Sequence, residues 1–288
     1  MLPGMASKAR IAIIGAGKLG SALAVSLRKA GYTIDVLITW SRESLPGARK
    51  LAKKVGARSG TDPREIKGEC IWLCVPDSEI SAVARAFPRQ LSWKGRVALH
   101  SSGALTSDAL DSLRRRGASV ASVHPLMTFV RGSRPSLAEV PFAIEGDSAA
   151  VRMARRMVRD LGGSAYSIRR QDKAAYHAWG MFASPLLTAL LATTERVAMI
   201  AGVSGKAAKK RMMPILQQTL ANYAAFGAPD AFSGPIIRGD VETIRRHLSV
   251  LKREPLAREV YTALARAALS YLPTKNRDKL KRLLASGR

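Results

Sequence analysis

The sequence predicts an α/β protein in which a Rossmann-type, doubly wound sheet is followed by an all-helical C-terminal domain. Three observations support this fold class. Short apolar segments alternate with amphipathic helical segments through the first half of the chain, which is typical of a parallel sheet covered by helices. A glycine-rich turn joins the first strand to the first helix. Strand signals stop near residue 168, so we expect one domain at residues 1–168 and a second at residues 169–288.

The individual elements follow from the spacing of apolar residues. Strands are expected where apolar residues run together between turn residues, and helices where apolar residues recur every three or four positions. The expected strands lie within residues 10–17, 33–40, 69–76, 96–103, 119–126, 141–147 and 164–168. The expected helices lie within residues 18–31, 45–56, 78–87, 105–117 and 148–163, and then within 170–202, 204–227, 240–272 and 274–287. Gly180 and Pro185 are expected kink points in the first C-terminal helix.

The composition excludes several classes of protein. Hydrophobic residues make up 47% of the 288 positions, but no run of eighteen uncharged apolar residues is present, so we expect no membrane span. The N-terminus is too polar for a secretory signal, which favours a cytoplasmic protein. Cys70 and Cys74 share one expected strand without a neighbouring cluster of His or Cys. We therefore expect reduced core thiols and no metal site.

The formal net charge of +26 is the most unusual global feature. Such a charge is typical of proteins that bind polyanions. The basic residues are nevertheless spread along many segments, without an aromatic-interleaved basic motif. This distribution favours solvated helix faces and faster encounter with an anionic cofactor or substrate. A nucleic-acid-associated protein is the alternative.

A dinucleotide-binding fingerprint lies between the first expected strand and helix. Gly15, Gly17 and Gly20 form the G-x-G-x-x-G pattern in its usual strand-to-helix context. Such glycines make the tight turn, let a pyrophosphate approach the backbone, and let helix and strand pack closely. We expect the cofactor to contact this turn and the helix start, which are residues Gly15, Ala16, Gly17, Lys18, Leu19 and Gly20. A glycine-rich turn without a ligand is the alternative.

The end of the second expected strand favours NADP over NAD. NAD sites usually carry an acidic residue roughly twenty residues past the fingerprint, whereas this chain has Ser41 and Arg42 there, and Asp35 comes too early. A Ser–Arg pair can bind the 2′-phosphate of NADP. Arg42 as a plain turn residue is the alternative. Val75 and Pro76, at the end of the third expected strand, would face the nicotinamide half of the cofactor.

Polar residues gather at the ends of two further expected strands. His100, Ser101, Ser102 and Gly103 follow one strand, and His124 follows the next. Ligands of open α/β sheets bind outside these strand ends. The serine hydroxyls and the N–H groups around Gly103 could hold a substrate carboxylate or carbonyl, and His124 could exchange a proton with it. The alternatives are that the serines cap the next helix and that His124 donates a structural hydrogen bond.

A second group of polar residues begins the long helix. Lys173 and His177 are four residues apart and so share a helix face, with Tyr176 beside them. A partly buried Lys173 could carry the proton in a hydride transfer, and His177 and Tyr176 could contact the substrate. An ordinary amphipathic helix start is the alternative. Farther along, Arg238 follows a Gly-Pro turn and could reach an anion, with a solvated turn arginine as the alternative.

With these motifs, the chain resembles the 6-phosphogluconate-dehydrogenase-like group of two-domain reductases. Within it, the chain is most similar to the uncharacterised family that pairs a Rossmann-like half with a helical domain of unknown function. The resemblance rests on "IGAGKLG", "CVPD", "HSSGAL", "HPL.TF", "FAIEGD", "K..YHA..MFAS" and "GPIIRGD", which occur in this order along nearly the whole chain.

Relatives of known chemistry imply roles for some of these residues. Prephenate-dehydrogenase-like enzymes place a serine and a His-Pro pair where Ser102 and His124 stand, which implies that His124 exchanges the proton with help from Ser102. The 3-hydroxyacid dehydrogenases place a catalytic lysine at the position of Lys173, but His177 replaces their asparagine. Pyrroline-5-carboxylate reductases share the architecture and a dimer of C-terminal helices, although their helix signature is missing here.

Residues and resemblance together predict an NADP-dependent oxidoreductase that transfers a hydride between nicotinamide and a small carbonyl, hydroxyacid or imine. Ser101, Ser102 and Gly103 would orient this small-molecule substrate, and His124 or Lys173 would carry the proton. A homodimer through the C-terminal helices is expected. An NADP-binding sensor or scaffold without turnover is the first alternative, and the nucleic-acid-associated protein is the second.

Overall fold

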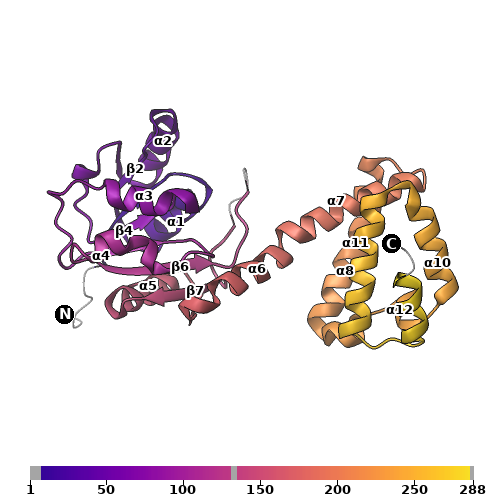
Figure 1. Ribbon diagram of the computed structural model, residues 1–288. Coiled ribbons are helices and arrows are strands. Elements are labelled where there is room, and N and C mark those ends of the chain that lie inside the picture. Colours follow the sequence, from indigo (N-terminus) through magenta and orange to yellow (C-terminus); the bar gives the residue numbers. More distant parts are fainter. Residues whose placement is uncertain (1–7, 131–134, 286–288) are drawn as a thin grey trace. The chain divides into compact units, whose positions relative to one another are not determined.

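A computed structural model describes residues 8–130 and 135–285. The chain divides into two compact units, one ending at Met181 and one beginning at Phe182. The N-terminal unit is an α/β domain and the C-terminal unit is all-helical (Figure 1). The predicted fold class is therefore confirmed.

An eight-stranded sheet forms the centre of the N-terminal unit. The strand order is β3-β2-β1-β4-β5-β6-β7-β8, and every neighbouring pair is parallel except β6 and β7. The strands are β1 (Arg10–Ile14), β2 (Thr33–Ile38), β3 (Arg58–Gly60), β4 (Cys70–Leu73), β5 (Val97–His100), β6 (Ser119–Pro125), β7 (Pro141–Gly146) and β8 (Ser164–Ser167). The sequence did not predict β3, because its three residues include no large apolar side chain.

Helices cover both faces of this sheet (Figure 1). Side chains alternate between the faces along a strand, so Ile11 and Ile13 pack on one face and Ala12 and Ile14 on the other. Both sets are fully buried, as expected for central parallel strands. The helices are α1 (Lys18–Lys29), α2 (Leu45–Val55), α3 (Asp77–Ala86), α4 (Asp111–Arg114), α5 (Ser148–Asp160) and most of α6 (Lys173–Ala183).

Short 3₁₀ turns connect several of these elements. They are η1 (Arg42–Ser44), η2 (Pro63–Glu65), η3 (Ser107–Leu110) and η4 (Arg170–Asp172). The helix expected within residues 105–117 consists of η3 followed by the four-residue α4. Thr106 caps η3 by accepting a hydrogen bond from the Asp108 N–H. The cap is therefore Thr106 rather than Ser101 or Ser102.

The C-terminal unit contains α7 (Pro185–Ile200), α8 (Gly205–Ala231), α9 (Pro235–Arg238), α10 (Val241–Val250), η5 (Leu251–Arg253), α11 (Pro255–Tyr271) and α12 (Arg277–Ala285). Its buried core consists of Ile244, Leu248, Ala265, Leu269, Leu280 and Leu284, from α10, α11 and α12. The expected break at Pro185 is present between α6 and α7, whereas Gly180 lies inside α6. Pro255 likewise separates η5 from α11, since proline is well suited to the first turn of a helix.

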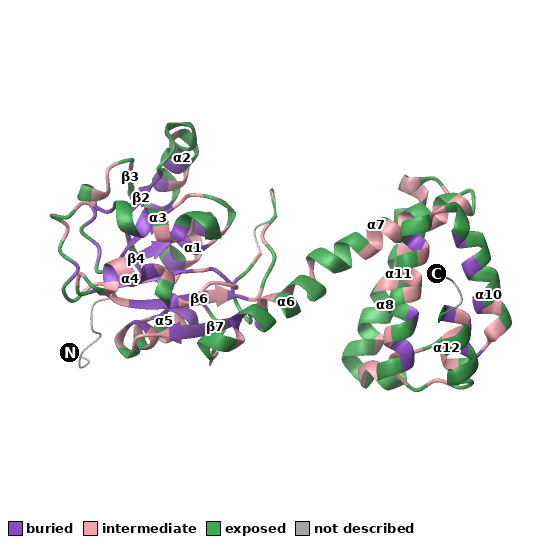
Figure 2. Ribbon diagram, in the orientation of Figure 1, coloured by how far each residue is buried: buried purple, intermediate pink, exposed green. Residues whose placement is uncertain are grey.

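Helix α7 is apolar but holds no buried residue (Figure 2). By contrast, the start of α6 buries Lys173 and Tyr176 in the N-terminal unit. No single helix among the described residues is long and apolar enough to cross a membrane; one bent pair, Arg170–Ile200 with Gly205–Arg238, passes that test by length and composition.

Candidate cofactor and active site

The fingerprint glycines close the turn between β1 and α1. Gly15 has a φ of +98°, and a Cβ there would lie 2.5 Å from the Cys74 carbonyl oxygen. A Cβ on Gly20 would lie 2.0 Å from the Gly15 carbonyl oxygen. Gly17 differs, because a Cβ there would meet no atom within 4 Å. Gly15 and Gly20 are thus required by packing, while Gly17 borders open space.

A pocket of about 440 Å³ opens at this turn. It lies where β1 and β4 are neighbours in the sheet, the point at which the order of parallel strands reverses and ligands of such folds bind. Gly17 is the N-cap of helix α1 and provides no side-chain cap, so the first N–H groups of the helix can bind an anion. The lining residues are Gly17, Lys18, Leu19, Leu73, Cys74, Val75, Pro76, Asp77 and Ser101.

The pocket brings together five of the predicted cofactor residues, namely Gly17, Lys18, Leu19, Val75 and Pro76, and adds Ser101 from the predicted substrate group. Gly15, Ala16 and Gly20 shape the turn behind it. Asp77, which also lines the pocket, was not predicted as a site residue. Its position directly after the "CVP" strand end could have indicated it, since strand ends carry the ligand contacts of this fold.

Ser41 and Arg42 lie at the end of β2, as predicted. The Ser41 hydroxyl accepts a hydrogen bond from the Glu43 N–H and so begins η1. Arg42 is exposed, and its guanidinium makes no hydrogen bond or ion pair with any described residue, which leaves this group available to an anion. Asp35 has a structural role instead, because its buried carboxylate binds Arg10, Arg58 and the N–H groups of Lys67 and Gly68.

The segment from His100 to Gly103 is held by its own hydrogen bonds. Nδ1 of His100 accepts the Ser102 N–H, and its Nε2 lies 3.0 Å from the Thr106 carbonyl oxygen. The Ser101 hydroxyl accepts the Trp72 indole N–H at 2.8 Å. The Ser102 hydroxyl donates to Asp77 at 2.5 Å, and it accepts the N–H groups of Ala104 and Leu105.

These bonds reduce the number of donors that the loop can offer to a substrate. The N–H groups of Ser102, Ala104 and Leu105, on either side of Gly103, are already used within the loop. The predicted contact of Ser101, Ser102 and Gly103 with a substrate stays a prediction. The Ser-Ser-Gly pattern at residues 101–103 allowed both interpretations, because a serine next to glycine can hydrogen-bond its own backbone as readily as a ligand.

His124 and His177 lie against Gly103, and Tyr176 lies against His124. A Cβ on Gly103 would lie 2.7 Å from Cδ2 of His177 and 2.9 Å from Nε2 of His124, so only glycine fits between the two rings. Nδ1 of His124 lies 2.7 Å from the Tyr176 hydroxyl. The fold thus brings the predicted residues of α6 together with those of β5 and β6. Arg238 lies exposed in the C-terminal unit, and its predicted substrate contact stays a prediction.

Lys173 lies beneath the same loop with only 1% of its surface exposed. Its Nζ donates to the Ser102 carbonyl oxygen at 2.9 Å and to the Ser122 hydroxyl. The ammonium is therefore engaged by the protein on two sides. Its predicted role as a proton carrier stays a prediction; the geometry assigns it first to holding the loop.

Burial controls the protonation of this cluster. Burial, together with the positive charge of Lys173, lowers the pKa of His100 and that of His124 to about 4. Burial also lowers the pKa of Lys173 to about 8 and raises that of Tyr176. At neutral pH both imidazoles are neutral. The Tyr176 hydroxyl and Nδ1 of His124 share one hydrogen bond, whose direction depends on the imidazole tautomer. In the tautomer in which the hydroxyl donates, the ring proton is on Nε2, beside Gly103.

Glu145 on β7 is a supporting residue that the sequence analysis did not single out. Its buried carboxylate accepts hydrogen bonds from the N–H and hydroxyl of Ser107 and from the guanidinium of Arg170. It ties η3, which follows the Ser102 loop, to η4, which precedes Lys173. Glu145 lies within the "FAIEGD" motif, but neither its spacing nor its residue type indicated this contact.

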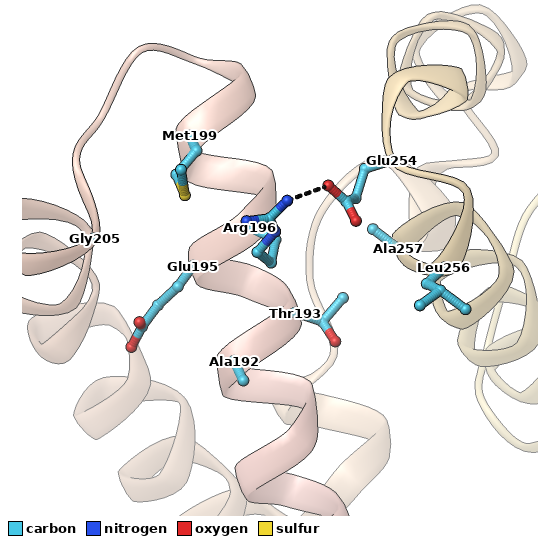
Figure 3. Close-up of a pocket in the computed structure, with 9 residues that line it drawn as sticks. All are labelled: Ala192, Thr193, Glu195, Arg196, Met199, Gly205, Glu254, Leu256 and Ala257. Carbon is cyan, nitrogen blue, oxygen red and sulfur yellow. Dashed lines mark hydrogen bonds and ion pairs between the residues drawn. The ribbon is translucent and has the colours of Figure 1, made fainter.

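A second pocket, of about 390 Å³, lies wholly in the C-terminal unit between α7 and α11 (Figure 3). Arg196 and Glu254 form an ion pair across it at 3.1 Å. Glu195 adds a second carboxylate to this lining, which disfavours a phosphate, and no glycine-rich turn adjoins the pocket. The candidate cofactor site is therefore the pocket at the fingerprint.

Fold and site define a two-domain protein with a Rossmann-like half and a helical half. Family models match in that order: the Rossmann-like domain at residues 5–125 and the domain of unknown function DUF2520 at residues 140–268. The chain therefore contains both of these domains, in the order that its motifs predicted. Membership of the 6-phosphogluconate-dehydrogenase-like group stays a prediction. No match was found among curated proteins.

Solved structures share this fold at low sequence identity. A Bacteroides fragilis protein, proposed to be an NADP oxidoreductase, is 21% identical with a TM-score of 0.73, over 91% of this chain and 98% of that one. An imine reductase from Myxococcus stipitatus in complex with NADP⁺ is 18% identical with a TM-score of 0.63, over 91% and 94%. A reductive aminase from Aspergillus terreus in complex with NADPH and ethyl levulinate is 16% identical with a TM-score of 0.67, over 98% and 100%.

Proposed function

We propose that the protein is an NADP-dependent oxidoreductase that transfers a hydride between nicotinamide and a small carbonyl, hydroxyacid or imine. One observation carries the proposal: the fingerprint pocket reaches Ser101, and Gly103, two residues further on, is enclosed by His124 and His177. A cofactor cleft and a group of polar side chains thus meet within one unit. The names of the structural neighbours support the same class of reaction.

The residues present fit NADP(H). Gly17 leaves open space at an uncapped helix start, where a pyrophosphate would bind the N–H groups of α1. Arg42, exposed and without a partner among the described residues, would bind the 2′-phosphate. Bound NADPH would supply the hydride. Nε2–H of His124 would then donate a hydrogen bond that orients the substrate oxygen or nitrogen.

Arg42→Ala tests the cofactor choice. Loss of a charge-assisted bond to phosphate typically costs about 1.5–3 kcal/mol, so we expect the Kd for NADPH to rise roughly tenfold to a hundredfold. The Kd for NADH should stay unchanged. The exposed Arg49 on α2 provides the matched control, Arg49→Ala. Fluorescence titration measures all four values, and equal losses for NADPH and NADH in Arg42→Ala would contradict the assignment.

Turnover distinguishes an enzyme from an NADP-binding sensor. The measurement is the loss of NADPH absorbance with a panel of small ketones, 2-keto acids and cyclic imines. Tight NADPH binding without turnover of any of them would favour the sensor. Failure to bind NADPH would contradict both functions.

We also propose that the protein is a homodimer through its C-terminal helices. Large exposed apolar patches mark interaction sites in water-soluble proteins. The exposed apolar side chains of α7 and α8 include Leu186, Leu187, Met199, Met213, Ile215, Leu220, Tyr223 and Phe226.

Sedimentation velocity is expected to give twice the 31.0 kDa chain mass. Glutamate at both Leu220 and Phe226, which are 60% and 63% exposed, should shift the species to monomer because a charged side chain is costly to bury. A wild-type monomer at micromolar concentration would contradict the dimer.

A further inference from the structure

Asp77 is the acidic residue of the candidate site. It is the first residue of α3, follows the end of β4 and lines the fingerprint pocket together with Ser101. One carboxylate oxygen, Oδ2, accepts the Ser102 hydroxyl at 2.5 Å. Asp77 is exposed, and its carboxylate makes no ion pair with any described residue. The pocket wall beside the loop of residues 100–103 therefore carries a carboxylate whose second oxygen has no partner among the described residues.

The loop of residues 100–103 offers no free side-chain cation to an anionic group. The N–H groups of Ser102, Ala104 and Leu105 are used within the loop. The buried ammonium of Lys173 is bound by the protein. Lys18, the lysine of the pocket, stands at the start of α1, where the cofactor phosphates are expected. A substrate carboxylate next to Ser101 would face Asp77 without a free cation to balance it.

The acids available in the site also favour a cationic substrate. Reduction of a carbonyl needs an acid to protonate the alkoxide, but His124 is neutral at pH 7 because burial lowers its pKa to about 4. Lys173 is only 1% exposed. A protonated imine brings its own proton. Hydride addition to its carbon forms the C–H bond, and the π electrons become the nitrogen lone pair, so NADPH and iminium give NADP⁺ and a neutral amine.

We propose that Asp77 selects a cationic nitrogen substrate, an iminium ion or its amine product, by pairing its free carboxylate oxygen with the N–H⁺ group. This inference rests on the proposed NADP-dependent function. It makes Asp77 a specificity-determining residue and disfavours hydroxyacids and keto acids, which were left open above. Asp77 already holds the Ser102 hydroxyl, so the same side chain would link substrate charge to the position of the loop.

The test uses three probes with the same ring on NADPH-saturated full-length protein: cyclohexylamine, cyclohexanol and cyclohexanecarboxylate. Saturation-transfer NMR gives their affinities. For the wild type we expect the ammonium to bind about tenfold more tightly than the alcohol, and the carboxylate to bind most weakly. Asp77→Asn should reduce the preference to about twofold, because the amide keeps an acceptor for Ser102 but loses the charge. Glu79→Gln, an exposed acid two residues along α3, should keep the wild-type preference.

Several results would overturn the proposal. Equal affinity of the wild type for cyclohexylamine and cyclohexanol would overturn it without the need for any variant. Tighter binding of cyclohexanecarboxylate than of cyclohexylamine would also overturn it. If Asp77→Asn changes the affinity ratio of NADP⁺ to NADPH and leaves the amine unaffected, the carboxylate serves the nicotinamide ring instead. Absence of NADPH binding in the wild type refutes the proposed function itself, whereas NADPH binding without amine preference refutes only the role of Asp77.

Discussion

Gly17→Val is expected to weaken NADPH binding by on the order of a hundredfold or more while the N-terminal unit stays folded. The backbone of this glycine must come close to the pyrophosphate, and a branched side chain would occupy that space. No protein atom lies within 4 Å of a Cβ at this position, so the folded chain itself tolerates the change. Fluorescence titration with NADPH measures the loss, and near-ultraviolet circular dichroism verifies the fold.

Two other glycines provide the controls. Gly47 on α2 also has no atom within 4 Å of its Cβ position, and Gly47→Val should bind NADPH as the wild type does. Gly20→Val should fail to fold correctly, because its Cβ would lie 2.0 Å from the Gly15 carbonyl oxygen. Unchanged NADPH affinity in Gly17→Val would show that the glycine-rich turn is structural only.

Acid is expected to destabilise the N-terminal unit between about pH 6.5 and pH 4. Burial lowers the pKa of His100 and His124 from 6.5 to about 4, so in this window the unfolded chain binds protons that the folded chain does not. The free energy of unfolding therefore falls as the pH falls, and the loss is complete below the folded pKa. A pKa shift of this size lowers the free energy of unfolding by roughly 3 kcal/mol for the fully buried His100. The decrease is somewhat smaller for the partly exposed His124.

Tryptophan fluorescence during urea unfolding measures this effect in the N-terminal unit alone, because Trp40, Trp72, Trp93 and Trp179 all precede residue 182. Carboxylates also titrate in acid, so the informative quantity is the difference between wild type and His124→Gln. Between pH 6.5 and pH 4, the free energy of unfolding of His124→Gln should fall by about 2 kcal/mol less than that of the wild type. Identical slopes would mean that His124 is protonated as easily in the folded as in the unfolded chain.

Local patterns predicted most of the fold. The run of apolar residues in β1 and the glycines after it fixed the first strand, turn and helix, because each depends on neighbours in sequence. The pairing of β7 with β6 could not be read in the same way. Ala121 faces Gly146 and Val123 faces Ile144 in an antiparallel register, and an apolar strand carries the same pattern in either direction. Tertiary packing decided the direction.

The site was predictable as a location but not as a set of contacts. Strand ends indicated Ser101, Ser102 and His124, since parallel strands present their carboxyl ends at one edge. The partners of these residues come from distant segments. Lys173 donates to the Ser102 carbonyl oxygen from 71 positions away in the sequence. Asp77 accepts the hydrogen bond of the Ser102 hydroxyl from 25 positions away. No spacing rule covers such pairs. The packing of α3 and α6 against the strand ends creates them.

A crystal structure of the protein with NADPH tests the central claim most directly. The account predicts the pyrophosphate at the N–H groups of Lys18 and Leu19, the 2′-phosphate at Ser41 and Arg42, and the nicotinamide beside Ser101, within reach of His124. A pocket that stays empty at millimolar NADPH, or a nicotinamide bound far from Ser102, His124 and Lys173, would contradict it.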